Sequence, residues 1–444
     1  MKTPKHLSFS SLRTAFSQIL EQLPDQRQAA KTKHRLHDAV MSSFACMFFQ
    51  DPSLLHFQQQ LKEQHNMDNL SSIFNVDSIP QPTQLRDIVD GVDSAAFQPV
   101  FNELLDRLRT DKLLKSFEFM DDLYLCSLDA TQFFSSETIT CAHCLKTTHA
   151  GGVTTYSHKA LQAAIMHPDR KQVIALMPEE ISNDDGHTKQ DCEINAAKRL
   201  LPKLRQQHPH MKFIICGDGL YSKYPFVAEA QRQDMHFILV AKPDDHCSMM
   251  NVIAASSASV HEQCRRDERG RLHRYRWISQ VPLSGNSIYT PFVNFFSYQL
   301  IVYDKRGKEK ITYQNSWVTD LDVTADTIEL LVRAARCRWK IENECFNTLK
   351  NQGYRIEHNF GHGNNNLCFN FFILTLLAFF FHQLFELADQ CYQACRVKFG
   401  SKAHLWQTLR SYIRVIFFYS FEHLLAFALT PPGFKAPPLS SLAV

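Results

Sequence analysis

The sequence predicts an α/β protein with a mixed β-sheet flanked by helices. Apolar residues recur every three to four positions through residues 1–120, which is the period of a helix. After residue 120, short apolar runs such as LYLCSL (123–128) and FIIC (213–216) alternate with helical patterns, as in a sheet whose strands are joined by helices. A further stretch, 244–324, is rich in aromatic and β-branched residues and predicts a β-strand insertion.

The expected elements follow one another along the chain in that order. Turns that contain proline or asparagine separate the first helices, and polar turns such as DKRGKEK separate three antiparallel strands of the insertion. The expected helices lie at 9–23, 34–49, 53–63, 97–115, 191–207 and 225–233, and the expected core strands at 123–128, 153–167, 172–177, 213–216 and 237–241.

This pattern divides the chain into five segments. A helical N-terminal region, 1–120, precedes the first part of the α/β core at 121–243. The β-strand insertion occupies 244–324, and the core resumes with a helix at 325–363. A helical C-terminal region and a proline-rich tail fill 364–444.

Composition and charge favour an intracellular protein with a polyanionic partner. The chain has 444 residues, a net charge of +3 and 13 cysteines, an odd number that, without a signal-peptide pattern, indicates a reducing compartment such as the cytoplasm. Basic residues cluster at 1–35 and 198–212, which suits a polyanion, although each patch is also compatible with a plain solvated surface. The apolar run at 370–387 is interrupted by polar residues and predicts a buried core helix, with membrane insertion as the alternative.

Three carboxylates are candidates for metal-dependent chemistry. Asp129 and Asp218 each follow a strand-like run, and the carboxyl end of a buried strand projects its side chain into the crevice above an α/β sheet. Glu342, on a predicted helix, would complete the group. Converging carboxylates need a cation, and oxygen ligands favour two Mg²⁺ or Mn²⁺ ions that clamp an in-line phosphoryl transfer. The alternative is that both aspartates are ordinary turn or cap residues.

Helical spacing selects Glu342 over its neighbour Glu344. Arg338 lies four residues before Glu342, so the two side chains share a face, and Cys345 and Leu349 continue that face toward a core. We therefore expect Glu342 on the inward face of the helix and Glu344 at the surface.

Three segments resemble the catalytic segments of DDE transposases, which have a ribonuclease H-like core. They are LDATQFFSS (128–136), CGDGLYSKYPF (216–226) and RWKIENECFNTLK (338–350). The similarity covers about residues 123–363 and is to the bacterial insertion-sequence family whose third segment carries a Tyr, Arg, Glu, Lys signature. Ala335 stands where that family has its tyrosine, and the lysine at the end of the third segment lies one residue beyond the family position.

The resemblance implies both a site and an activity. Asp129, Asp218 and Glu342 would hold two divalent ions, Arg338 would orient Glu342 or a phosphate, and Lys350 would contact DNA. The activity would be cleavage and strand transfer of double-stranded DNA at the ends of an insertion sequence, carried out by a homodimer on DNA. The helical N-terminal region would recognise the ends.

A second cluster predicts a structural zinc site. Cys141, Cys144, His149 and His158 have the spacing C-x2-C-x4-H-x8-H, which offers two thiolates and two imidazoles to a tetrahedral ion. His143 is a spare ligand, and reduced thiols without a metal are the alternative. Such a zinc ion would hold the hairpin that follows the first aspartate and would not react.

Residues of the insertion are candidates for DNA contact. In RLHRYRWISQV, alternation along a strand places Arg274 and Arg276 on one face and the aromatic Tyr275 and Trp277 on the other. Arginines for phosphates and an aromatic ring for an unstacked base are what DNA handling requires. In the resembled family an aromatic residue of the insertion holds a flipped base, and Trp277 and Trp317 are the candidates here, with core packing as the alternative.

These observations lead us to expect a cytoplasmic DNA transposase without a membrane anchor. The rivals are a nuclease of the same fold that lacks strand transfer, an inactive DNA-binding protein, and a membrane-associated protein built on the apolar run at 371–387. The polar run NDDGHTKQDCE (183–193) is interpreted as a polar loop with an acidic helix start. The alternative is a supporting role near the metal ions, and no functional residue is assigned in the run.

Overall fold

The chain folds into two compact units. This computed structural model describes residues 4–28, 32–60, 64–120, 122–183, 190–284, 290–304, 306–431 and 433. One unit comprises Met1–Leu108, Asn351–Arg355 and Asn370–Val444, and the other comprises Arg109–Lys350 and Ile356–Phe369. The helical N-terminal and C-terminal regions therefore belong to the same unit.

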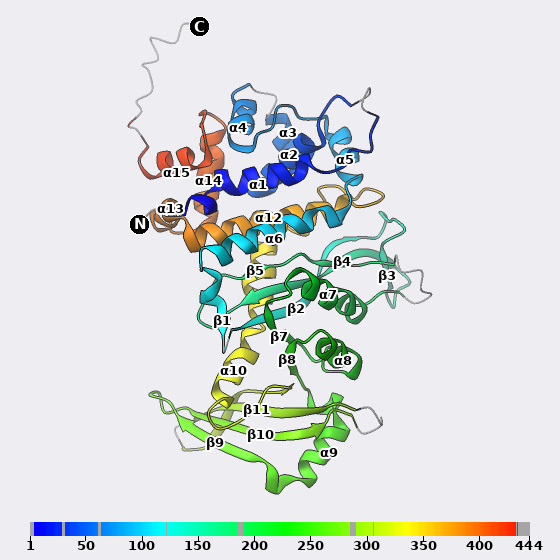
Figure 1. Cartoon of the computed structure of the whole chain (residues 1–444), viewed down its shortest axis with the longest axis vertical. Helices are drawn as coiled ribbons and strands as arrows, with labels where there is room; N and C mark the ends of the chain where they lie inside the picture. The colour runs from blue at the N-terminus through cyan, green and yellow to red at the C-terminus, as the bar shows by residue number, and fades with distance from the viewer. Residues whose placement is uncertain are drawn as a thin grey trace. The chain divides into compact units, whose positions relative to one another are not determined.

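The first unit is built of helices (Figure 1). Aromatic side chains form much of its core. Phe381 packs edge-on against Phe44 and Phe48, an arrangement that aromatic rings favour. Phe381 lies on α12, which is long and apolar enough to cross a membrane, but 94% of its most apolar window is buried inside the protein. The prediction of a buried core helix is therefore confirmed. The helices are α1 (Phe9–Glu21), α2 (Leu36–Phe48), α3 (Leu54–Gln60), α4 (Gln64–Phe74), α5 (Pro82–Asp90), α6 (Gln98–Thr110), α12 (Leu367–Ala388), α13 (Gln390–Phe399), α14 (Lys402–Ile413) and α15 (Phe421–Leu429).

The second unit contains a mixed, largely antiparallel β-sheet flanked by helices, which confirms the predicted α/β class. β2 (Leu123–Ser136) runs parallel to β7 (Lys212–Gly217), and β7 runs parallel to β8 (His236–Val240). On its other side β2 pairs antiparallel with β4 (Thr154–Met166). The short strands β3 (Leu145–Thr148), β5 (Ile174–Ala175) and β6 (Glu179–Ile181) pair with β4, and β1 (Glu118–Phe119) pairs with β2.

Helices connect the parallel strands and bury their apolar faces. α7 (Glu193–Gln207) leads from β6 to β7, and its Ala196, Leu200 and Leu204 are buried at the helical spacing that the sequence shows. α8 (Tyr224–Arg232) leads from β7 to β8. The helix predicted from residue 325 is observed as α10 (Ile328–Cys337), a π-helical turn at Ile341–Phe346, and α11 (Asn347–Asn351).

The insertion extends the core sheet and does not form a sheet of its own. β12 (Glu309–Thr319) pairs with β8 through Trp317 and Val240, and β11 (Phe292–Tyr303), β10 (Leu272–Pro282) and β9 (His261–Arg266) follow in antiparallel order. The sequence predicted three strands here. β9 was missed because its sequence, HEQCRR, is polar and largely exposed, so it lacks the apolar alternation of a half-buried strand. α9 (Cys247–Ala255) precedes it.

Gly217, the last residue of β7, makes the sheet sensitive to a single added methyl group. A Cβ at this position would lie 2.8 Å from Tyr221 Cδ2 and 3.1 Å from Leu239 Cδ2. We expect Gly217→Ala to lower the free energy of unfolding by about 1–3 kcal/mol, the usual cost of overpacking. Urea unfolding of the full chain measures this. Gly151→Ala is the matched control because nothing lies within 4 Å of its Cβ; equal midpoints for the two variants would contradict the close packing.

Candidate active site

The register of two parallel strands brings the two predicted aspartates together. Ser127 of β2 pairs with Cys216 of β7, 89 residues later, and the same offset relates Asp129 to Asp218. Residues at the same register position on neighbouring parallel strands lie on the same face of a sheet, about 5 Å apart. Asp218 directly follows the end of β7, so this offset places both aspartates at the same end of the two strands.

The strand that carries Asp129 is longer than predicted. The expected strand ended at residue 128, whereas β2 continues to Ser136, and Asp129 pairs with Gln162 of β4. The pairing of β2 with β7 does end at Ser127. The apolar run LYLCSL ends at residue 128, and beyond it β2 continues in antiparallel pairing with β4, with partly exposed side chains. Asp129 is thus a strand residue at the point where its parallel neighbour stops.

A buried serine joins the three segments that carry the candidate carboxylates. Ser127 is fully buried, and its Oγ lies 3.3 Å from the carbonyl oxygens of both Cys216 and Arg338. Each of these three residues lies two to four positions ahead of one of the carboxylates. The hydroxyl therefore ties β2, β7 and the beginning of the π-helical segment to one another at the edge where the aspartates emerge.

Glu342 lies on the π-helical turn and pairs with Arg338, as predicted. Arg338 Nη2 donates a hydrogen bond to Glu342 Oε1 at 2.6 Å. The expectation that Glu342 faces inward was wrong, because its side chain is 48% exposed while Glu344 is half-buried. A π-helical turn holds an extra residue, which rotates the side chains away from the register of a regular α-helix. Cys345 and Leu349 are buried as expected.

The candidate carboxylates act on one another electrostatically. Burial, together with the negative charges of Glu342 and Asp218, raises the pKa of Asp129 to about 7, and Arg338 partly opposes this rise. Burial and the carboxylates of Glu193, Asp218 and Asp129 also raise the pKa of the Tyr221 hydroxyl. These shifts mean that carboxylates from separate segments of the chain lie close to one point. A group of this kind fits a hard divalent cation, which would relieve the repulsion between the negative charges.

Glu193 is a fourth carboxylate at this site, and it is not among the residues predicted from the sequence. Burial and Asp218 raise the pKa of Glu193, and Lys159 opposes them. Glu193 is the first residue of α7. β6, which precedes this helix, runs antiparallel to β4, so it ends at the edge from which Asp129 emerges. The acidic helix start was correctly recognised, but only the strand order shows that it faces the aspartates. Asp184, Asp185 and His187 of the same run lie outside the described residues.

Three of the four predicted zinc ligands come together, and the fourth ligand differs from the predicted one. Cys141, Cys144 and His158 come together, and the fourth side chain is His362. His149 is directed elsewhere, with Nε2 2.8 Å from Thr155 Oγ1 across the hairpin. The ligand set that includes His149 is therefore corrected. His362 was missed because it lies 204 residues after His158, and sequence spacing carries no information about so distant a partner.

Both tryptophans proposed for base contact are packed inside the sheet region. Trp317 is 1% exposed and stacks on Phe296, and Trp277 is 6% exposed and stacks on His261. These positions fit the alternative of core packing for both tryptophans. A buried ring offers no face on which a DNA base could stack.

Each of the predicted basic residues lies beside an acidic partner; Arg276 is exposed, and Arg274 and Lys350 are half-buried. Arg274 and Arg276 lie on the more exposed face of β10, opposite Tyr275, as the alternation predicted. Arg276 lies 3.4 Å from Glu262, and Lys350 pairs with Glu357 at 2.7 Å. Exposed pairs of this kind contribute little to stability, so their cations remain able to exchange partners.

Comparison of the sequence with known protein families finds no matching family, and comparison with curated proteins finds no match. The functional conclusion therefore depends on the site itself.

The raised pKa of Asp129 predicts a pH-dependent instability in the metal-free protein. Between the unfolded value of about 4 and the folded value of about 7, the folded state binds the proton more tightly, so its stability falls as the pH rises through this interval. Asp129→Asn removes the charge. In EDTA, we expect the thermal midpoint of the variant to exceed that of the wild type increasingly between pH 5 and 8. A constant difference across this range would contradict the coupling.

Proposed function

We propose that this chain is a DNA transposase of the DDE type, which cuts and rejoins the ends of an insertion sequence by metal-dependent phosphoryl transfer. One observation carries the proposal. Asp129, Asp218 and Glu342 come from three separate segments of the chain, and Ser127 Oγ, beside Asp129, lies 3.3 Å from the carbonyl oxygens of Cys216 and Arg338 in the other two. The charges of both other carboxylates also contribute to the raised pKa of Asp129. These are the residues that match the catalytic motifs of the family that the sequence resembles.

The chemistry assigns a role to each side chain. Asp129, Asp218 and Glu342 would hold two Mg²⁺ or Mn²⁺ ions, which supply charge stabilisation to the attacking and leaving oxygens of an in-line displacement. Arg338 fixes the carboxylate of Glu342 through its hydrogen bond. A water molecule would attack the phosphodiester at the element end and break its bond to the 3′-oxygen, which leaves a 3′-hydroxyl on the element and a 5′-phosphate on the flanking strand. That 3′-hydroxyl would then attack a phosphodiester of the target, join to its phosphorus and displace a 3′-hydroxyl of the target strand. No side chain needs to act as a nucleophile.

The sheet order supports a ribonuclease H-like core. In the described residues, β4, β2, β7 and β8 are neighbours in this order, the first pair antiparallel and the other two parallel. α7 and α8 cross over between strands, and the π-helical segment follows the insertion. This arrangement is compatible with the fold that the resemblance implies, and it leaves the carboxylates at an accessible edge of the sheet.

A basic and aromatic cleft adjoins the helix that leads to Arg338. It has a volume of about 310 Å³. Two of its arginines pair with acidic residues, at 2.7 Å for Arg333 and Asp169 and 3.1 Å for Arg265 and Glu329. Trp339, which is 49% exposed, also lines it. Cationic side chains beside an exposed ring suit a DNA strand with an unstacked base. The basic and tyrosine residues of the lining are Arg265, Arg333, Arg336, Lys340, Tyr275 and Tyr298.

The remaining parts of the proposal follow from the family resemblance. The helical unit would recognise the element ends, two chains would assemble on the DNA, and the protein would work in the bacterial cytoplasm. A nuclease of the same fold is the second candidate, because the same carboxylates would support the cleavage step without strand transfer.

Replacement of one metal-binding carboxylate tests the mechanism. With Mg²⁺ and DNA that carries the ends of the element encoding this chain, we expect Asp218→Asn to reduce cleavage by at least about 100-fold, since even the loss of an outer partner of a metal ligand costs 10–100-fold. DNA binding should be retained, because the phosphate contacts lie elsewhere. Glu344→Gln, on the same helical turn as Glu342, is the matched control and should remain active.

The outcomes of this assay separate the candidates. Equal cleavage by wild type and Asp218→Asn would refute the proposed metal site. Cleavage without joined products would favour the nuclease, and specific binding without any cleavage by the wild type would favour an inactive DNA-binding protein.

The exposed ring of Trp339 in the cleft leads to a prediction about DNA binding. Because its ring is exposed, Trp339→Ala should leave the fold intact and weaken the binding of end DNA that contains a single-stranded flank by about 1–3 kcal/mol, the usual value for one base–aromatic stack. Fluorescence anisotropy measures the Kd. Phe292→Ala removes a ring that is 60% exposed and does not line the cleft, so its Kd should match that of the wild type. Equal Kd values for all three proteins would exclude stacking on Trp339.

A further inference from the structure

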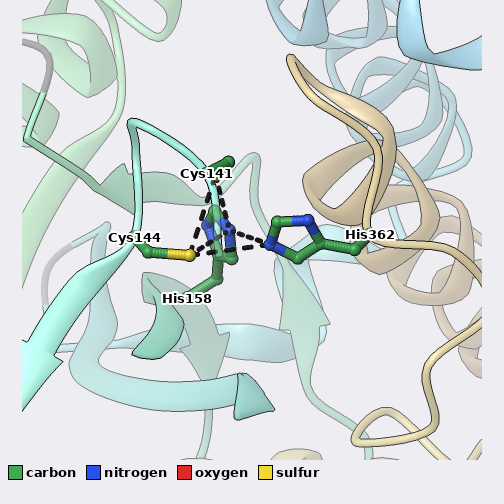
Figure 2. Close-up of side chains that lie close together, drawn as sticks. All are labelled: Cys141, Cys144, His158 and His362. Carbon is green, nitrogen blue, oxygen red and sulfur yellow. Dashed lines mark hydrogen bonds between the residues drawn. The ribbon is translucent and has the colours of Figure 1, made fainter. Parts of the chain in front are cut away.

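Four side chains of the second unit direct one ligand atom each toward a common point (Figure 2). They are Cys141, Cys144, His158 and His362, and their ligand atoms all lie within 4.8 Å of one another. Cys144 and His158 are buried, and the other two are half-buried. The group lies apart from the proposed catalytic carboxylates, so its chemistry needs its own explanation.

The distances match the edges of a zinc tetrahedron. With Zn–S bonds of about 2.3 Å and Zn–N bonds of about 2.05 Å, the edges should measure about 3.8 Å between sulfurs, about 3.6 Å between sulfur and nitrogen, and about 3.3 Å between nitrogens. Cys141 Sγ and Cys144 Sγ are 3.7 Å apart. Their distances to His158 Nε2 are 3.5 and 3.4 Å, and Cys144 Sγ lies 3.5 Å from His362 Nε2. The two Nε2 atoms are 3.2 Å apart.

Hydrogen bonds alone do not explain this arrangement. A hydrogen bond joins a donor to an acceptor, usually in pairs, whereas Cys144 Sγ and His158 Nε2 each contact all three other ligand atoms. Five of the six pairs of ligand atoms are in contact, as a shared central ion would require. The set of two sulfurs and two nitrogens is typical of a structural zinc ion, with no position left for water or substrate.

The surroundings orient both imidazoles for metal binding. His158 Nδ1 lies 3.3 Å from Glu180 Oε1, and His362 Nδ1 lies 2.8 Å from the carbonyl oxygen of Gly363. A carboxylate and a carbonyl only accept hydrogen bonds, so each Nδ1 carries the proton and each neutral Nε2 presents a lone pair to the centre. Gly363 has φ of 68°, a left-handed conformation that glycine adopts without strain. Such outer partners are usual around protein-bound zinc.

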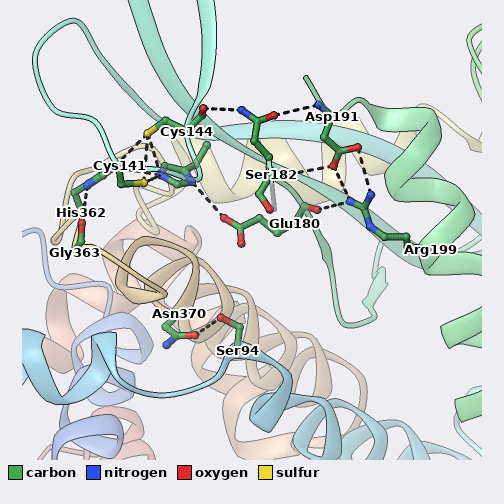
Figure 3. A network of polar contacts seen from close by, with 12 residues as sticks. Ser94, Cys141, Cys144, Glu180, Ser182, Asp191, Arg199, His362, Gly363 and Asn370 are labelled. Carbon is green, nitrogen blue, oxygen red and sulfur yellow. Dashed lines mark hydrogen bonds and ion pairs between the residues drawn. The ribbon is translucent and has the colours of Figure 1, made fainter. Parts of the chain in front are cut away.

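The hairpin side of the group is held by a polar network (Figure 3). Asn183 Nδ2 donates to the carbonyl oxygen of Cys144, and Asn183 Oδ1 accepts from the backbone N–H of Asp191. Asp191 in turn pairs with Arg199 of α7 at 2.7 Å, and Arg199 also donates to the carbonyl oxygen of Glu180. The knuckle between the cysteines is therefore supported before any metal binds, which lowers the ordering cost of binding.

We infer that Cys141, Cys144, His158 and His362 bind one structural Zn²⁺ ion, which cross-links two distant parts of the second unit. The cysteines lie in the loop between β2 and β3, and His158 lies on β4, the antiparallel partner of the Asp129 strand. His362 belongs to the segment that returns after the Glu342 helix. The ion would thus join the part of the chain that follows Asp129 to the part that follows Glu342. Zinc binding at this site does not depend on DNA cleavage by the carboxylates.

The first test is metal binding by the full-length protein. Elemental analysis should find about one zinc per chain, and replacement by Co²⁺ should produce the visible bands of a tetrahedral ion with thiolate charge transfer. The absence of both zinc and these bands would overturn the inference. Because Mg²⁺ is omitted, the result is independent of DNA cleavage.

The second test distinguishes His362 from His149. His362→Ala should weaken zinc binding by at least about 100-fold in competition with a chromophoric chelator, since a direct ligand should contribute more than an outer partner. His149→Ala should leave the affinity unchanged, because this side chain contacts Thr155 and not the cluster. Retention of zinc by His362→Ala, or its loss from His149→Ala, would refute the ligand set.

A third variant covers the case in which His362→Ala fails to fold. His362→Cys offers a thiolate in place of the imidazole, so it should bind Co²⁺ with a stronger charge-transfer band than the wild type. Glu180→Gln should weaken zinc binding by about 10–100-fold while the spectrum stays tetrahedral. An unaltered Co²⁺ spectrum in His362→Cys would show that residue 362 is not a ligand.

Discussion

The parallel register between β2 and β7 is the constraint on which the site depends. Pairing Ser127 with Cys216 sets Asp129 beside Asp218, and a slip of one residue would turn one carboxylate to the other face of the sheet. Both strands are buried in this region, which makes such a slip costly. The Ser127 hydroxyl extends the same constraint to a third segment through the Arg338 carbonyl. The buried Ser127 hydroxyl therefore contacts both of the other segments that carry the candidate carboxylates.

Gathering carboxylates in one place destabilises the folded chain, and the fold offsets only part of that repulsion. Arg338 and Lys159 oppose the raised pKa values of Asp129 and Glu193, but the shifts remain upward. An arrangement that repels itself persists when function requires it and when rigid elements hold it. Here strands and a helix start hold the acidic groups, and a divalent cation would supply the missing positive charge.

The two candidate metal sites differ in kind. The carboxylate site is partly open, with Glu342 48% exposed, and its oxygen ligands suit a hard ion that also contacts substrate. The Cys/His group is closed, with four protein ligands, and the Phe134 ring lies 4.5 Å from that of His362. A closed sulfur and nitrogen site provides stability, whereas an open oxygen site allows chemistry. β2 carries Asp129 and leads into the loop that holds the two cysteines, so it connects the two sites along the chain.

Local patterns in the sequence determined the α/β class and the buried helix α12. They also determined the pairing of Arg338 with Glu342 and the position of Asp218 at the end of a strand. Each of these features depends on residues that lie close together in the chain. The tertiary structure decided which residues that are distant in sequence come together. Glu193 lies near Asp218, and His362 takes the place of His149 in the Cys/His group. Packing decided the burial of Trp317, and a π-helical turn decided the exposure of Glu342. Periodicity reports which face of an element is apolar, but it does not report which other element covers that face, and only the tertiary structure determines that.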